Sequence, residues 1–268
     1  LMLAMAAPSW ATTWTVTSGM SIQSAINGAS NGDTIEVNTG TYTECLDPNG
    51  RNISIQGIGS VLINGSSCST VTVSGAEVLE LSDLELQNTS GLVLEVTSSN
   101  ASVSLSNISV SSSGYTSQGP NSLGGVVYTE GAVSIEGSNF SSNTGGLGGV
   151  IYADGGSVSI VNSTFSGNSA LKGAVVYARD GTVVTSTNNT YENNWTVNGG
   201  FGGVFSFVFG VDFIEDGSIF ESNLSDSNGG VIYANHNFAS SQPNVISISN
   251  ALFDTNQAGD GNFTTGSG

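Results

Sequence analysis

The stretch that decides the fold is 124–168, which reads GGVVYTEGAVSIEGSNFSSNTGGLGGVIYADGGSVSIVNSTFSGN and contains the same pair of motifs twice. The first motif is GGVVY at 124–128 and GGVIY at 148–152, so it returns after 24 positions. The second motif is FSSN at 140–143 and FSGN at 165–168. Between them, apolar and polar residues alternate, and this period of two is typical of β-strands. The stretch therefore predicts a unit of short strands that repeats about every 24 residues.

The repeat continues on both sides of this stretch. Downstream, the first motif recurs as GAVVY, GGVFS and GGVIY at 173–177, 202–206 and 229–233, and the second as YENN, FESN and FDTN at 191–194, 220–223 and 253–256. Upstream the pattern is weaker but legible, since SVSLSNISV at 102–110 parallels SVSIVNSTF at 157–165. The clearest repeats therefore span 124–256.

A unit that returns to the same motif favours a solenoid over an antiparallel sandwich, whose turns recur about every 8–12 residues without such a return. Stacked coils place equivalent residues about 4.8 Å apart. Apolar residues then form internal ladders, asparagines at the bends hydrogen-bond along the stack, and glycines fit bends with positive φ. The sequence predicts an all-β parallel β-helix of about ten coils, forming a single domain over 12–268.

The two ends of the chain differ from the repeats. In SIQSAINGASNG at 21–32, apolar residues recur at three- and four-residue spacing, which predicts a short helix that caps the first coil. The segment 1–11, LMLAMAAPSWA, reads as the remnant of a signal peptide, with a buried strand as the alternative. The polar segment 259–268 offers no second cap, so we expect a fragment or a natural protein that continues beyond it.

The charge of the chain excludes several partners. Its 268 residues include 21 acidic and 3 basic side chains, for a formal net charge of −18. So few cations argue against nucleic-acid binding, and an acidic surface repels acidic polysaccharides unless calcium intervenes. No stretch approaches the roughly 18 apolar residues of a spanning helix, so we expect no membrane insertion by this segment.

The two cysteines, Cys45 and Cys68, are 23 positions apart, which is about one repeat. Stacking would place them on adjacent coils, with their Cα atoms near the roughly 4.4–6.8 Å that a disulfide requires. In an exported chain such a pair favours a disulfide, whereas in a cytosolic chain it would mean two free thiols.

Two stretches resemble known β-helix families. The segment 21–59, with GDTIEV, GTYTE and NISIQGIG, resembles the opening of secreted pectin-lyase-like right-handed β-helix proteins. The paired motifs from Gly124 onward are similar to the GGA[ILV] and FxxN repeats of chlamydial polymorphic outer-membrane proteins, although 172–174 and 202–206 only approximate them. The resemblance implies a right-handed fold, secretion or outer-membrane display at the cell surface, and adhesion or host contact.

The sequence offers no convincing catalytic or metal site. Its only cations are Arg51, Lys172 and Arg179, and its only histidine, His236, lies in a polar loop without a neighbouring aspartate. The densest carboxylate group alternates faces along a strand and lacks the DxDxDG spacing, so calcium is unsupported there and no cofactor is expected. That group comprises Glu77, Glu80, Asp83 and Glu85.

The tyrosines of the first motif are the candidate binding residues. The fourth position of the motif is always large and apolar, while the fifth position accepts serine at Ser206. Neighbouring strand residues face opposite sides, so we predict that the fourth position is buried and the tyrosines form an exposed row, with a tyrosine core as the alternative. The candidate residues are Tyr128, Tyr152, Tyr177 and Tyr233.

These observations favour a non-enzymatic, secreted or surface-displayed β-helix that acts in adhesion or as an extracellular structural or binding module. Its expected partner is a host cell, a glycan or a protein. The alternative is a carbohydrate-active enzyme, either a lyase or a hydrolase, because the same fold carries both. Ice binding is disfavoured, because the Thr70-Val-Thr72 pattern does not recur at the coil period.

Overall fold

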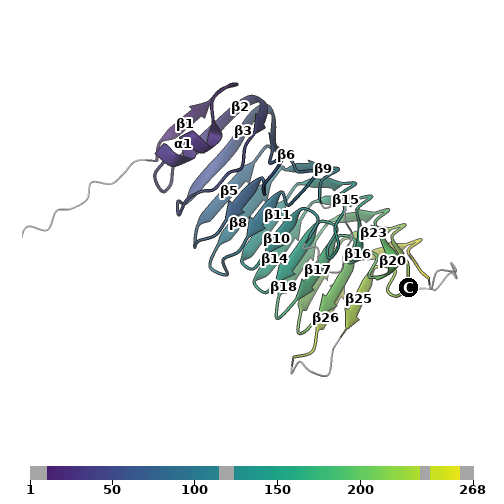
Figure 1. The fold of residues 1–268 in the computed structure, drawn as a ribbon. Helices are drawn as coiled ribbons and strands as arrows, with labels where there is room; N and C mark the ends of the chain where they lie inside the picture. Colours follow the sequence, from purple (N-terminus) through teal and green to yellow (C-terminus); the bar gives the residue numbers. More distant parts are fainter. Residues whose placement is uncertain (1–10, 115–123, 236–241, 260–268) are drawn as a thin grey trace, which may run out of the picture.

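The chain forms an all-β, right-handed parallel solenoid. The repeats predict the parallel solenoid, and the resemblance to pectin-lyase-like proteins implies its handedness. The computed structural model describes residues 11–114, 124–235 and 242–259. The expected leader and the polar C-terminal segment lie outside the described residues, apart from Ala11 and Gly259. Figure 1 shows a rod that begins with the helix α1 (Ile22–Gly28) and ends near β26 (Val245–Ser249).

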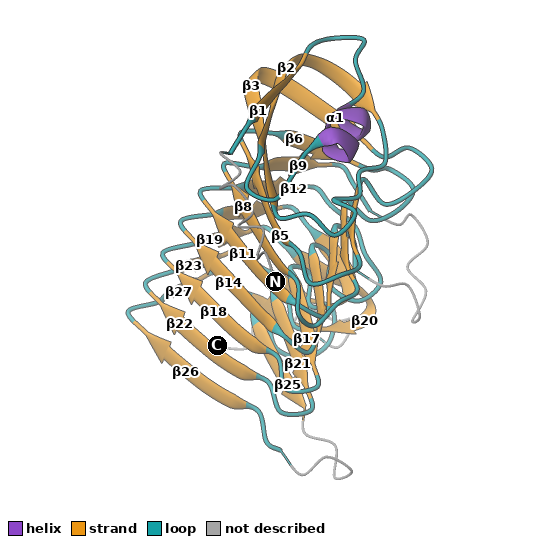
Figure 2. Ribbon diagram, turned by 90° about the vertical axis from the view of Figure 1, so that its left-hand side faces the viewer, coloured by secondary structure: helices purple, strands orange, loops and turns teal. Residues whose placement is uncertain are grey.

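The largest sheet has 17 strands within the described residues, all paired in parallel, and forms two columns that β2 and β3 both span. Figure 2 shows its strands stacked one above the other. The first column contains β1 (Thr13–Val16), β2 (Thr34–Thr43), β3 (Ile53–Asn64), β5 (Val78–Ser82), β8 (Ser102–Ser106), β11 (Ala132–Glu136), β14 (Ser157–Val161), β18 (Val183–Thr187), β22 (Asp212–Asp216) and β26. The second column contains β6 (Glu85–Gln87), β9 (Ser109–Ser111), β12 (Asn139–Ser141), β15 (Thr164–Ser166), β19 (Thr190–Glu192), β23 (Ile219–Glu221) and β27 (Leu252–Asp254).

Two smaller sheets contribute further strands to the turns of the solenoid. The seven-stranded sheet contains β4 (Val71–Val73), β7 (Leu94–Val96), β10 (Val127–Thr129), β13 (Ile151–Asp154), β17 (Val176–Arg179), β21 (Phe205–Val208) and β25 (Ile232–Asn235). The four-stranded sheet contains β16 (Ser169–Lys172), β20 (Trp195–Phe201), β24 (Leu224–Ser225) and β28 (Gln257–Ala258).

The solenoid has about seven turns, so the expectation of about ten is wrong. Several coils are longer than 24 residues: Val103 pairs with Val133, and Phe220 pairs with Phe253. The first two coils also have no strand in the seven-stranded sheet. Helix α1 follows β1 in the first coil, and in the second coil β2 is followed only by an isolated bridge between Leu46 and Val71.

Helix α1 is held in place by the carboxylate of Glu44, which directly follows β2. Ser21 is its N-cap and accepts a hydrogen bond from the backbone N–H of Ser24. Glu44 accepts hydrogen bonds from the backbone N–H groups of Ile22 and Gln23, at 2.9 and 3.0 Å, which satisfies two donors at the helix end. Ile22 and Ile26 are fully buried in the main core. No helix among the described residues is long and apolar enough to cross a bilayer.

The second motif builds two internal ladders. Its aromatic residues stack from coil to coil, with ring centroids 4.8–5.2 Å apart and planes within 14° of parallel. Its asparagines donate side-chain hydrogen bonds to the next asparagine's Oδ1 at 2.9–3.1 Å, which confirms the predicted ladder. The aromatic ladder is Phe140, Phe165, Tyr191, Phe220 and Phe253, and the asparagine ladder is Asn143, Asn168, Asn194, Asn223 and Asn256.

The two cysteines lie on adjacent coils at the helix-capped end. Cys45 and Cys68 form a disulfide, and their Cα atoms are 6.1 Å apart. Cys45 directly follows Glu44, whose side chain holds the N-terminus of α1.

We expect replacement of both cysteines by serine to lower the free energy of unfolding by about 2–3 kcal/mol, because the loop of 23 residues regains entropy when the chain unfolds. Urea unfolding with and without a reductant measures this. The reductant should destabilise the wild-type chain and leave the Cys45→Ser/Cys68→Ser variant unchanged. Equal midpoints for all four samples would contradict the expected role of the disulfide.

Candidate functional site

The tyrosines of the first motif are buried, so the expectation of an exposed row is wrong. Tyr128, Tyr152 and Tyr177 are only 8%, 4% and 7% exposed. The fourth-position residues beside them, including Ile151 and Val176, are fully buried in the main core, as predicted. The tyrosines do lie on the other face of the strands, but there they form a second apolar cluster with Leu92, against which Leu147 and Val208 pack.

The buried rings contact one another rather than solvent. Tyr128 and Tyr177 each meet Tyr152 edge to face, with centroids 5.4 and 5.3 Å away. Burial raises the pKa of Tyr152, and it raises the pKa of Tyr177 to about 12. Ser206 interrupts the column, and Tyr233 beyond it is half-buried and stacked on Phe201. The structure therefore does not bring the four candidate tyrosines together as one exposed surface.

A charged cluster borders these rings. Arg179 Nε lies 3.3 Å from Asp154 Oδ1 and also contacts Asp180, while its Nη1 lies 3.5 Å from the Tyr152 hydroxyl. Burial raises the pKa of Asp154, and the nearby Arg179 opposes that shift. The guanidinium is thus shared between two carboxylates.

The other two cations, Arg51 and Lys172, lie on separate parts of the solenoid. Arg51 donates to the backbone carbonyls of Ala29 and Asn27, so it holds the end of α1 to the next coil. Lys172 lies on β16 of the four-stranded sheet. His236 lies outside the described residues.

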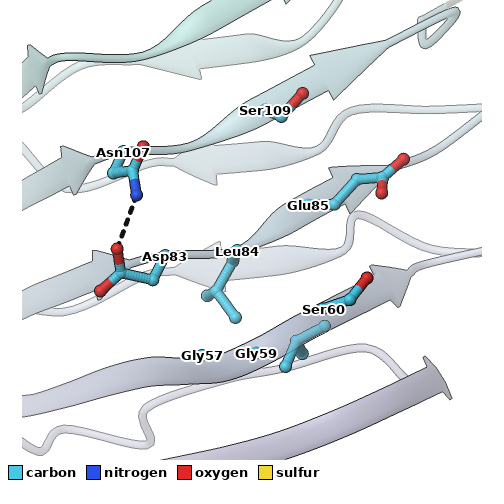
Figure 3. Close-up of a pocket in the computed structure, with 9 residues that line it drawn as sticks. Gly57, Gly59, Ser60, Asp83, Leu84, Glu85, Asn107 and Ser109 are labelled. Atoms are coloured by element: carbon cyan, nitrogen blue, oxygen red, sulfur yellow. Dashed lines mark hydrogen bonds between the residues drawn. The ribbon is translucent and has the colours of Figure 1, made fainter.

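An open hollow of about 400 Å³ lies on the outer surface of the large sheet (Figure 3). It forms because β3 continues as one strand through Gly57 and Gly59, whereas the next coil bends at Asp83 between β5 and β6. Asp83 has φ +57°, and a Cβ on Gly57 would overlap its carbonyl oxygen, so only glycine fits beneath this bend. The lining comprises Gly57, Gly59, Ser60, Val61, Asp83, Leu84, Glu85, Asn107 and Ser109.

The polar groups of the hollow are two carboxylates, one amide and two hydroxyls. Asp83 accepts hydrogen bonds from Asn107 Nδ2 at 2.7 Å and from Gln56 Nε2 at 3.3 Å, which orient its carboxylate. Glu85 and Ser109 are paired in register on β6 and β9, and both are exposed. No cation is among the nine lining residues, so the hollow presents mainly hydrogen-bond acceptors.

The structure separates the four carboxylates that the sequence groups together. Glu77 is buried and accepts from the backbone N–H of Gly50, and Glu80 accepts from the Ser54 hydroxyl. Only Asp83 and Glu85 reach the hollow. Within the described residues, no three His, Cys, Asp or Glu side chains gather closely enough to hold a metal ion. The hollow was not predicted from the sequence. The pattern that could have indicated it is the pair of closely spaced glycines, Gly57 and Gly59, on the strand next to the bend at Asp83.

Comparisons with known proteins bear on the fold. No family model matches the chain, and no curated protein matches it in sequence. Among solved structures, a mutant of the PL6 family alginate lyase AlyGC is similar, with a TM-score of 0.55 and 15% identity, over 93% of this chain and 41% of that chain. Another structure of AlyGC has a TM-score of 0.44 at 14% identity, over 90% of this chain and 40% of that chain.

At this identity the likeness shows the β-helix fold alone, and the chain spans about two-fifths of the length of the lyases it matches. The resemblance of the repeats to chlamydial surface proteins stays a prediction.

Proposed function

We propose that the chain is a non-enzymatic, secreted or surface-displayed β-helix module that binds neutral glycans in the hollow beside Asp83 and Glu85. The observation that carries the proposal is the lining of the hollow, which combines two carboxylates, an amide and two serine hydroxyls with a glycine floor. Carboxylates accept hydrogen bonds from sugar hydroxyls, whereas an amide both donates and accepts them, and charged acceptors make the stronger bonds.

The charge of the hollow favours a neutral sugar over a uronate. A uronate carboxylate would face Asp83 and Glu85 without any cation among the lining residues. The whole chain adds a net charge of −18, which repels acidic polymers at long range. Arg179, on the seven-stranded sheet, is shared between two carboxylates and offers no unpaired charge for a uronate.

A polysaccharide is a ligand class that this fold can accommodate, since a similar solved structure is that of an alginate lyase. Alginate itself is a polyuronate, which the charge of the hollow disfavours. Display at a cell surface, with adhesion to a host-cell glycan, is part of the proposal and rests on the repeat resemblance. No nucleic-acid partner is proposed, because the chain has only 3 basic residues.

A carbohydrate-active enzyme is the second candidate, and one observation favours it. Glycoside hydrolysis uses a pair of carboxylates that flank the scissile bond, and Asp83 and Glu85 are two carboxylates in one hollow. Measurements of glycan binding and of glycan cleavage distinguish the two candidates.

We expect the purified chain to bind neutral oligosaccharides more tightly than uronate-containing ones on a glycan array, followed by calorimetry. Glu85→Gln should weaken the affinity about tenfold, because one charge-assisted hydrogen bond to the sugar becomes a neutral one. Glu80→Gln is the matched control, since Glu80 lies on the same sheet outside the hollow and bonds to Ser54.

Unchanged affinity in Glu85→Gln would place the glycan elsewhere on the rod. Preference for uronates, or release of an unsaturated product from them, would refute the neutral-glycan proposal. Release of new reducing ends from a neutral polymer, lost in Glu85→Gln, would establish the hydrolase instead.

A further inference from the structure

The chain contains eleven Asn-X-Ser/Thr triplets, the motif at which secreted eukaryotic proteins receive N-linked glycans. Within the described residues, three of these triplets end in threonine, so their recognition motifs are alike. They are Asn162-Ser-Thr164, Asn188-Asn-Thr190 and Asn194-Trp-Thr196. The fold gives the first two asparagines a different place in the coil from the third.

Asn162 and Asn188 occupy equivalent corners on adjacent coils. Each directly follows a first-column strand, β14 or β18, at the bend that leads to the second column (Figure 2). Their φ angles are +50° and +55°, in the left-handed region that asparagine adopts more readily than most residues. Both side chains are exposed, and neither Nδ2 donates a hydrogen bond to another described residue. Each amide nitrogen is therefore free to carry a substituent.

The corners on either side of this pair are glycines. Gly137 lies one coil before Asn162, and Gly217 lies one coil after Asn188. A Cβ on Gly137 would have no atom within 4 Å, whereas a Cβ on Gly217 would lie 2.5 Å from Asn188 Oδ1. The absence of side chains at both glycines leaves room for substituents on the two adjacent asparagines to diverge.

The threonines that complete the two corner motifs also face outward. Thr164 and Thr190 pair in register on β15 and β19, and both are half-buried. Their neighbours Phe165 and Tyr191 point into the core, so the threonine side chains lie on the outer face. The complete motif is thus on the surface at both corners.

Asn194 is fully buried in the asparagine ladder, although it lies only six positions after Asn188. Its Nδ2 donates two hydrogen bonds, to the Phe165 carbonyl and to Asn223 Oδ1, both 3.0 Å long. A glycan replaces one of the two N–H bonds, so it would remove one of these hydrogen bonds and put a sugar inside the core. Asn88 and Asn223 also donate two hydrogen bonds each, so the same exclusion applies to their motifs.

We propose that Asn162 and Asn188 are N-glycosylation sites and that Asn194 is not; the inference rests on the secretion that is part of the proposed function. The reaction forms a bond between the asparagine Nδ2 and the anomeric carbon of an oligosaccharide carried on a lipid pyrophosphate. The lipid pyrophosphate leaves with the electrons of the broken carbon–oxygen bond, and Nδ2 loses one proton. A chain that receives a glycan at Asn194 before it folds cannot complete the ladder, so folding removes it from the secreted population.

Secretion of the 268-residue chain from a eukaryotic cell line, behind an added cleavable signal, tests the proposal. A glycosidase that converts each glycosylated asparagine to aspartate is applied in ¹⁸O water, and the peptides are mapped by mass spectrometry. We expect the ¹⁸O label at Asn162 and Asn188 and none at Asn194. Thr190→Ala should remove the glycan on Asn188 alone, whereas the matched variant Thr190→Ser keeps the motif and should keep the glycan.

An unlabelled Asn162 or Asn188 in the secreted wild-type chain would overturn the proposal. A label at Asn194, in protein whose circular dichroism shows the full β-sheet content, would overturn it as well. Neither result depends on the folding of a variant. The added signal exports the chain whatever its natural route, so the glycan map tests the sites alone, and failure of glycan binding in the hollow would count against the proposed function only.

Discussion

Replacing Phe165 with alanine should lower the free energy of unfolding by about 3–5 kcal/mol. Its ring is fully buried and lies between those of Phe140 and Tyr191, with centroids 5.1 and 5.2 Å away. The alanine would leave a cavity in the middle of the aromatic ladder, and the rings above and below cannot close it, because their strands are fixed in register. Urea unfolding followed by circular dichroism measures the loss.

Phe253→Ala is the matched control, because Phe253 belongs to the same ladder and stacks on Phe220 with centroids 4.8 Å apart. Its side chain is 43% exposed, so the loss there should be roughly half as large or less. Equal losses at both positions would show that stacking along the ladder, rather than burial, dominates the stability of the core.

Replacing Gly148 with alanine should destabilise the chain by roughly 3–4 kcal/mol, through two separate effects. Gly148 has φ +70°, which costs any residue with a Cβ. A Cβ at this position would also overlap the carbonyl oxygen of Ile151, within the turn that starts β13. Relief of that overlap requires the bend to shift and to disturb the hydrogen bond from Gly125 N–H to the Gly148 carbonyl, which is 2.8 Å long.

Gly181→Ala separates the two effects, because Gly181 has φ +78° but no atom within 4 Å of a built Cβ. Its loss should be about 1–2 kcal/mol, the cost of the backbone conformation alone. Urea midpoints of the two variants provide the comparison, and a Gly181→Ala loss as large as that of Gly148→Ala would rule out the steric part of the argument.

The hollow shows what the sequence pattern leaves open. Asp83 and Glu85 stand out as neighbouring carboxylates in the sequence, but alternation alone suggests two solvated side chains. The hollow forms because the continuous strand β3 pairs with both β5 and β6, whereas the chain of the next coil bends at Asp83. These pairings join different coils, so the local alternation does not predict them.

The sequence by itself determined the parallel β-helix, the asparagine ladder and the proximity of Cys45 to Cys68. All three follow from the period-two alternation and from a motif that returns at a nearly fixed interval, since stacking brings residues one interval apart into contact. Only the tertiary structure decided that there are about seven turns, that the tyrosines are buried and that a hollow opens beside Asp83. Alternation sets which face of a strand a side chain occupies, but what covers an outer face comes from another part of the chain. Leu92, which packs against the tyrosine cluster, lies 36 positions before Tyr128, and no local pattern in the sequence encodes that contact.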